Sequence, residues 1–175
     1  SVSDDAIAPI ASQLKLKEQL VLHTAGSLSI DLLSQIGSPY YGTLYPLFSF
    51  TGQPIPANIQ IPFLIESNNT KSHTLLRNLA EQISDRVQDS THNQRLLFHL
   101  AAVFANNFSN QLFALSDELL AANGLTLDLL LPMLSHQVEQ LKKELPKYDI
   151  AITHDFFLQS TVTLSEAIRE CGVDI

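Results

Sequence analysis

The chain has 175 residues, of which 45% are hydrophobic and 16% are charged, and its formal net charge is −8. This composition excludes a disordered chain, and the acidic charge without any basic run argues against nucleic-acid or anionic-membrane partners. No apolar run reaches the roughly 18 residues of a membrane-spanning helix. The single cysteine, Cys171, excludes an internal disulfide, so a cytoplasmic protein is the simplest interpretation.

The first half of the sequence alternates predicted helices and strands. The acidic start of the chain, with Asp4 and Asp5, is typical of a helix N-terminus. We expect helices over residues 6–14, 28–36 and 72–88, and strands over 19–24, 41–50 and 60–66. The 41–50 strand is broken by Pro46, which has no backbone N–H to donate to a sheet. A strand that passes through a short turn into a helix is the βα unit of α/β folds.

The second half is expected to be helical throughout. Polar residues 89–91 separate it from the first half, so we place a domain boundary there, between an α/β portion over 1–88 and a helical domain over 89–175. We expect a long helix from near Thr91 to just before Gly124, a helix over 127–145 capped by Thr126, an extended segment over 148–153, and a last helix that begins with the capping box at 163–166 and closes at Gly172.

The long helix is the element around which the chain is organised. Its segment 95–118, RLLFHLAAVFANNFSNQLFALSDE, contains no Pro or Gly. At 100° per residue, one broad face is apolar and carries Leu97, Ala101, Phe104, Phe108, Leu112 and Leu115. The opposite strip is polar and carries Arg95, His99, Asn106, Asn110 and Asp117, with Asn107 at its edge. Asparagine is a poor helix former, so the strip either meets solvent and neighbouring loops or lines a cleft or subunit contact.

Two candidate site residues lie at the carboxyl end of the first predicted strand. His23 ends that strand and Ser27 begins the next helix, at the sheet edge where α/β folds bind ligands. The same residues also fit a plain connection in which Gly26 turns and Ser27 or Ser29 caps the helix. The dinucleotide fingerprint G-x-G-x-x-G is absent, because the glycines are isolated from one another.

Further candidates lie beside the strand break and on the long helix. Tyr45 precedes Pro46 and could reach a cleft, although a half-buried core position fits it equally well. His99, together with Asn106 or Asn107, could orient a small polar ligand. The histidines are scattered and form no metal-binding spacing, so we expect no metal site.

Six segments, taken in order, carry a family resemblance: SVSDDAIAPIA, VLHTAGSLSIDLL, YGTLYPLFSF, PFLIE, HLAAVFANNFSNQLFAL and LLPML. They resemble a bacterial family of Rossmann-like proteins with a C-terminal helical domain of unknown function. Its members are often labelled deazaflavin-type or NADP-dependent oxidoreductases and are related to pyrroline-5-carboxylate reductase. The resemblance covers residues 1–145 and is most specific at 99–108. The family's Gly-Pro-Ala-x-Arg-like segment is replaced here by 148–153.

In such proteins the SVSDDAI segment follows about half of the nucleotide-binding domain, including its glycine-rich turn. The resemblance therefore implies the second half of a Rossmann-like domain, followed by a helical dimerisation domain like the C-terminal domain of 6-phosphogluconate dehydrogenase. It implies an NAD(P)-dependent reductase that uses NADP, forms a homodimer through its helical domain, and binds a small substrate between its two parts. The cleft residues would be His23, Ser27, Tyr45, His99, Asn106 and Asn107. The alternative is a non-catalytic helical dimerisation or small-ligand-binding module, since the glycine motif is missing.

Overall fold

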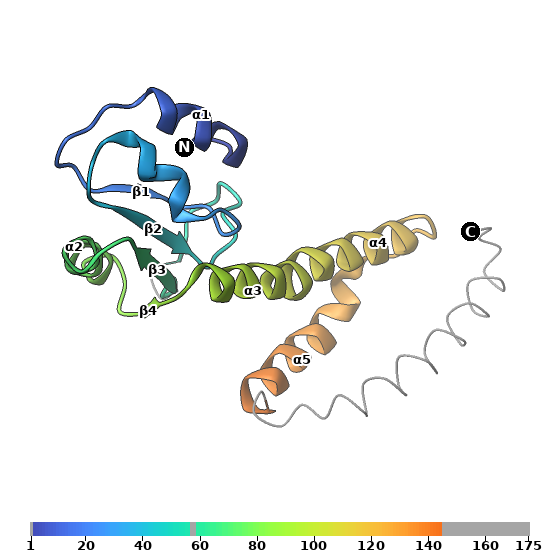
Figure 1. The fold of residues 1–175 in the computed structure, drawn as a ribbon. Coiled ribbons are helices and arrows are strands. Elements are labelled where there is room, and N and C mark those ends of the chain that lie inside the picture. Colours follow the sequence, from blue (N-terminus) through green and yellow to red (C-terminus); the bar gives the residue numbers. More distant parts are fainter. Residues whose placement is uncertain (1, 57–58, 145–175) are drawn as a thin grey trace. The chain divides into compact units, whose positions relative to one another are not determined.

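The computed structural model describes residues 2–56 and 59–144 (Figure 1). The chain divides into two compact units, Ser1–Ala114 and Leu115–Ile175. Strands occur among the described residues of the first unit only, and the described elements that follow the long helix are all helical. This arrangement confirms the predicted α/β portion followed by an all-helical part. The boundary expected near residue 88 stays a prediction.

The first unit is built on a mixed four-stranded sheet in the order β1-β2-β3-β4. Its strands are β1 (Val21–His23), β2 (Tyr41–Pro46), β3 (Phe63–Ser67) and β4 (Val87–Asp89). β1 and β2 are parallel, β2 and β3 are antiparallel, and β3 and β4 are parallel. The expected 41–50 strand ends at Pro46, as its missing N–H dictates.

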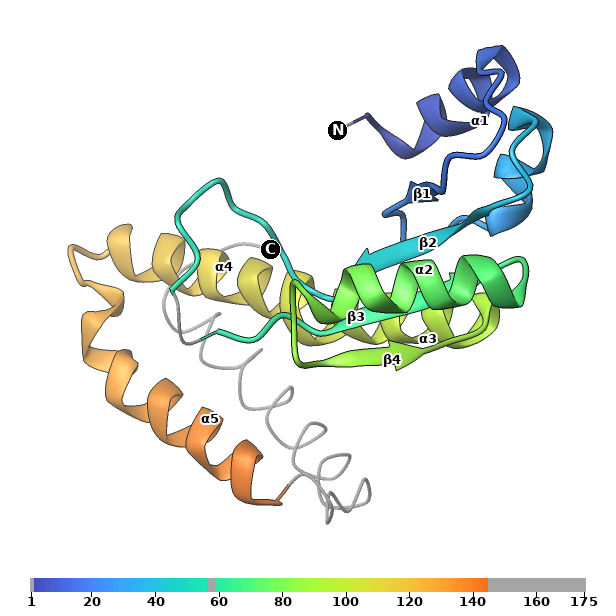
Figure 2. The same ribbon diagram turned by 90° about the vertical axis from the view of Figure 1, so that its left-hand side faces the viewer.

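Helices cover both faces of this sheet, because alternate strand residues point to opposite sides. On one face, Ile65 of β3 packs against Leu76 and Ala80 of α2 (Thr70–Glu81). On the other face, α1 (Asp4–Gln13) and the 3₁₀ helix η1 (Ile30–Ile36) form a second buried cluster, to which Ala11, Leu33 and Ile36 belong. Figure 2 shows α2 and α3 (His92–Ala102) on opposite sides of the sheet.

The helix expected over 72–88 is wrong at its C-terminal end. α2 stops at Glu81, and Val87 lies in β4 beside Phe63 of β3. Ser84 makes the turn between them, because its hydroxyl donates to the Ile61 carbonyl at 2.6 Å and accepts from the N–H of Arg86 at 3.1 Å. Val87 is still packed against the apolar core, but it reaches the core from a strand.

The long helix consists of α3, the π-helical segment η2 (Val103–Phe108) and α4 (Ser109–Ala121). Thr91 and Gln94 form a capping box at its start, in agreement with the expected beginning near Thr91. Its burial is the reverse of an ordinary amphipathic helix. Arg95 in the polar strip is fully buried, whereas Leu97 on the apolar face is 66% exposed. The helix therefore packs onto the sheet through its polar side.

The second unit begins within α4 and continues through the 3₁₀ helix η3 (Leu127–Leu130) into α5 (Leu131–Glu144). Pro132 is tolerated because it lies in the first turn of α5. Thr126, which was expected to cap this helix, makes no side-chain capping bond. The extended segment over 148–153, the capping box at 163–166 and Gly172 lie outside the described residues. In the described ranges, no helix has the length and apolarity to cross a membrane.

Candidate functional site

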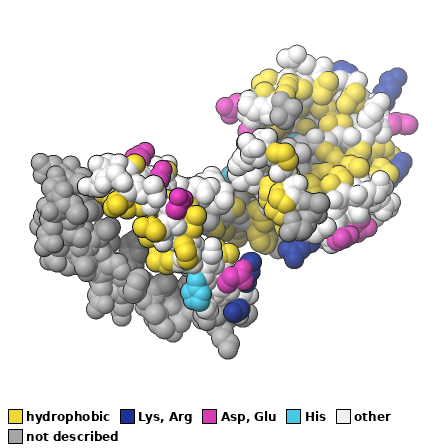
Figure 3. Space-filling model, turned by 180° about the vertical axis from the view of Figure 1, so that it is seen from behind, with side chains coloured by type: hydrophobic (Ala, Val, Ile, Leu, Met, Phe, Trp, Pro, Cys, Tyr) yellow, Lys and Arg dark blue, Asp and Glu magenta, His cyan; other side chains and the backbone are white. Residues whose placement is uncertain are grey.

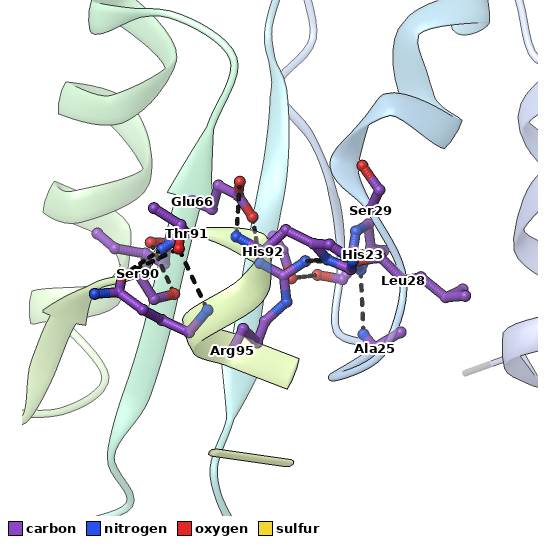
Figure 4. A network of polar contacts seen from close by, with 12 residues as sticks. His23, Ala25, Leu28, Ser29, Glu66, Ser90, Thr91, His92 and Arg95 are labelled. Atoms are coloured by element: carbon purple, nitrogen blue, oxygen red, sulfur yellow. Dashed lines mark hydrogen bonds and ion pairs between the residues drawn. The ribbon is translucent and has the colours of Figure 1, made fainter. Parts of the chain in front are cut away.

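A buried arginine joins three segments of the first unit (Figure 4). Arg95 lies near the start of α3, and its Nη1 forms an ion pair with the Glu66 carboxylate of β3. Its Nη2 donates to the Leu28 carbonyl at 2.5 Å and to His92 Nδ1 at 3.2 Å. Glu66 also accepts from the N–H of His92 at 3.2 Å. Because a buried charge needs partners, this network holds the start of α3 against β3 and the loop after β1.

This anchoring brings His99 of α3 against Tyr45 of β2. The Tyr45 hydroxyl lies 3.0 Å from His99 Nδ1, and the two rings meet edge to face with their centroids 6.1 Å apart. Burial raises the pKa of the Tyr45 phenol above its ordinary value, so the phenol keeps its proton at neutral pH. The pair therefore joins two groups that can donate, accept or transfer a proton.

Gly26, in the loop after β1, lies directly against this pair. A Cβ at this position would be 2.7 Å from His99 Nδ1 and 2.8 Å from Tyr45 Cζ, which is closer than packed atoms approach. Only glycine lets the loop backbone come this near. The turn expected at residues 25–27 thus has a packing role that helical and strand patterns do not reveal.

The π-helical segment places two asparagines beside the pair. Asn106 and Asn107 lie in η2, and the Asn106 amide donates to Asn107 Oδ1 at 3.1 Å. A π turn is rare and often occurs at functional sites, because its extra residue widens the helix and redirects side chains. Both asparagines lie in this segment, although asparagine is a poor helix former.

These residues meet at a cavity of about 460 Å³ within the first unit. Four of the six expected site residues line it, namely Tyr45, His99, Asn106 and Asn107. The remaining lining residues are Leu47, Phe48, Ser49, Thr51, Ala102, Val103 and Asn110. The cavity has the size of a small-molecule site and combines apolar walls with a few convergent polar groups.

His23 and Ser27 are placed elsewhere. His23 is buried on the sheet and lines a second cavity of about 250 Å³ beside α1. Its Nδ1 accepts from the N–H of Ala25 at 3.2 Å, and burial, aided by the Arg95 charge, lowers its pKa to about 4. Ser27 is exposed and its hydroxyl lies 3.5 Å from Asp4 Oδ2. Neither residue is among those that line the larger cavity.

Helical periodicity put Arg95 on a polar strip but did not reveal that it is buried. A lone arginine in an apolar helix, together with a glutamate in a buried strand, is the signal that could have indicated the Arg95–Glu66 pair. No comparable signal pointed to the contact of Gly26 with the Tyr45–His99 pair, since it depends on how the loop and the helix approach each other.

The described residues do not fit the phosphates of a dinucleotide. A phosphate cradle needs free backbone N–H groups and open space at a glycine turn that enters a helix. The space beside Gly26 is filled by Tyr45 and His99. The hydroxyl of Ser29 accepts from the N–H of Asp31 at the start of η1. Within the described ranges, no group of three or more potential metal ligands is found.

Comparison with known proteins identifies the family. The profile named "Domain of unknown function (DUF2520)" matches residues 61–151. A Bacteroides fragilis protein provisionally named an NADP oxidoreductase, BF3122, is 32% identical with a TM-score of 0.75 over 91% of this chain. Protein TM1727 of Thermotoga maritima is 26% identical with a TM-score of 0.70 over 97% of this chain.

This chain spans 64% of the length of the first protein and 67% of the second. No protein with a curated description matches it. The matched profile covers more than half of the chain, and the fold agrees with both solved structures. The chain therefore belongs to the DUF2520 family, a Rossmann-like family of unknown function whose structural relatives include an NADP oxidoreductase-like protein.

Proposed function

We propose that this chain forms the substrate-binding portion of a relative of NAD(P)-dependent reductases and binds a small molecule in the cavity at the Tyr45–His99 pair. The observation that carries the proposal is the meeting of Tyr45, His99, Asn106 and Asn107 at one cavity of about 460 Å³. The provisional name of the Bacteroides fragilis relative supports the reaction class. The described lining residues supply hydrogen-bond donors and acceptors together with groups able to exchange a proton.

NADP is the cofactor that the family resemblance suggests. Because the space beside Gly26 is filled by Tyr45 and His99, the described residues offer no phosphate cradle there. We therefore place the dinucleotide cradle outside the described residues. The chain's own contribution would be to bind and orient the substrate and to exchange a proton with it. A cytoplasmic location accords with this function.

The cavity can be tested by filling it. Ala102 lines the cavity, whereas its neighbour Ala101 is exposed and is not a lining residue. We expect Ala102→Leu to abolish the binding of small carbonyl compounds that the unmodified chain selects from a library, and Ala101→Leu to leave it intact. Saturation-transfer NMR would measure binding. Equal binding by both variants, or no binding by the unmodified chain, would count against the substrate site.

A second candidate function is a helical dimerisation module without catalysis. The long helix exposes large apolar side chains on its outer side, among them Leu97 (66%), Phe104 (59%) and Phe108 (51%). Figure 3 shows hydrophobic side chains on the described surface of the helical part as well as on the α/β part. Such surface is unusual on a monomer and is commonly buried in a two-fold contact. We propose a homodimer through this surface whichever of the two functions applies.

A further inference from the structure

The contact between Tyr45 and His99 determines which ring nitrogen a ligand could reach. A neutral imidazole carries one proton, and the nitrogen that accepts a hydrogen bond is the one without it. If the Tyr45 hydroxyl donates to His99 Nδ1, the proton lies on Nε2. If instead Nδ1–H donates to the phenol oxygen, the phenol proton needs another acceptor.

The surroundings of the phenol favour the first arrangement. Its hydroxyl makes one hydrogen bond among the described residues, the one to His99 Nδ1 at 3.0 Å. Burial raises the pKa of the Tyr45 phenol above its ordinary value, so the phenol has a proton to donate at neutral pH. The reverse arrangement would leave that half-buried O–H without a partner in the described part of the chain, which is unfavourable.

Gly26 holds the pair in place from the loop side. Its backbone lies so close that a Cβ would meet Nδ1 at 2.7 Å. No side chain at this position separates the loop from the pair, so the imidazole is held between the loop and the tyrosine. Nδ1 is thereby occupied by the tyrosine, and we infer that Nε2 is the nitrogen through which His99, a lining residue of the cavity, meets a ligand.

The other polar groups that line the cavity are also uncharged and can donate hydrogen bonds. Asn107 Oδ1 accepts from the Asn106 amide, which leaves the Asn107 Nδ2 group as a donor. The described lining residues of the cavity include no Asp, Glu, Lys or Arg. An ionised ligand group would therefore lack an opposite charge among them, whereas a carbonyl oxygen could accept from uncharged donors.

We propose that Tyr45 is a positioning residue that holds His99 as the Nε2–H tautomer, so that the cavity presents uncharged donors to the carbonyl oxygen of a neutral substrate. The assignment rests on the proposed substrate site, because it specifies the polarity of that cavity. The tautomer of His99 can be measured without any ligand. A wrong tautomer assignment can therefore be distinguished from a wrong proposed function.

The test is a nitrogen-15 NMR correlation spectrum of the imidazole rings in the full chain, recorded at about pH 8, where an ordinary imidazole is neutral. His99→Gln identifies the signals of His99. We expect the unmodified chain to show the Nε2–H pattern for His99. Tyr45→Phe keeps the ring but removes the hydroxyl, so the pattern should shift toward a mixture of both tautomers. Tyr40→Phe, which alters a hydroxyl that contacts Lys71 instead, should leave it unchanged.

An Nδ1–H pattern in the unmodified chain would overturn the proposal whatever the variants do, including a Tyr45→Phe chain that fails to fold. An unchanged Nε2–H pattern in a folded Tyr45→Phe variant would also overturn it, because the tautomer would then not depend on the phenol. If the tautomer behaves as expected while no carbonyl compound binds, the positioning role stands and the substrate site is refuted.

Discussion

Arg95 is the residue on which the position of the candidate site depends most directly. It is fully buried and its partner Glu66 is 20% exposed at its side chain. Arg95→Met should lower the free energy of unfolding by roughly 2–4 kcal/mol, because it leaves a carboxylate unpaired in a partly buried place. Urea unfolding at neutral pH would measure the change.

The double variant Arg95→Met with Glu66→Gln provides the control. Glutamine at 66 removes the unpaired charge and keeps an oxygen that can accept from the N–H of His92. We expect the double variant to be more stable than Arg95→Met alone. A double variant that loses as much as the two single variants together would show that the charges do not interact.

His23 should make the stability of the chain depend on pH. Its pKa is about 4 in the folded chain and near 6.5 when unfolded, because burial opposes its charged form. Between these values the unfolded chain binds more protons, so stability falls as the pH drops from 6.5 toward 4 and is unaffected by His23 above that range. As the pH drops through this range, we expect the protonation of His23 to lower the free energy of unfolding by roughly 2 kcal/mol.

Urea unfolding at pH 7 and pH 4.5 would measure this effect. His23→Asn offers a matched comparison, because its side-chain oxygen can still accept from the N–H of Ala25 while the titrating ring is gone. The variant should lose less stability on acidification than the unmodified chain. The same loss in both chains would show that other groups account for the acid sensitivity.

At the scale of elements, periodicity identified the faces of the long helix but not which face is covered. The sequence places Arg95 and Leu97 on different sides, and a globular helix would normally bury the leucine. The Glu66 carboxylate and the Leu28 carbonyl reverse this, and both come from segments distant in sequence. The prediction of Val87 in a helix was wrong because of another contact distant in sequence. Val87 lies in β4, and this strand forms by pairing with β3.

The exposed apolar side of the long helix predicts self-association of the 175-residue chain. We expect a dimer in light scattering at micromolar concentration, and we expect Leu97→Glu or Phe104→Glu to shift it toward monomer by placing charges in the contact. Ile83→Glu is the matched control, because Ile83 is 56% exposed but lies after α2, away from this helix. A monomeric unmodified chain, or equal effects of all three variants, would contradict the dimer.

At the scale of the whole molecule, the sequence was sufficient for the fold class and the family. The order of predicted elements and the six matching segments both led to an α/β portion followed by helices, which the structure and the family match confirm. The directions of the strands could not be predicted, because they depend on how the connections cross the sheet. The cavity at Tyr45 and His99 likewise required the packing of α3 on β2.

The chain as a whole should bind NADPH only weakly. It has six glycines, all isolated, and the space beside Gly26 is filled by side chains. Calorimetric titration of the 175-residue chain would measure this, with a version extended at the N-terminus as the comparison that we expect to bind. Tight binding by the 175-residue chain would refute the placement of the dinucleotide cradle elsewhere in the protein.

The π-helical segment also affects how the chain tolerates changes in length. A π turn closes its hydrogen-bonded rings over one residue more than an α turn, so it acts as a single-residue insertion absorbed by the helix. Deleting one residue between Val103 and Phe108 could leave an unbroken α-helix. Because the π turn absorbs its extra residue, the α-helix after the deletion would keep its faces, whereas a deletion in an α-helical part would rotate the following residues by about 100°. Loss of a single codon in this segment would therefore alter the turn that carries the asparagines at the cavity while it leaves the faces of the rest of the helix unchanged.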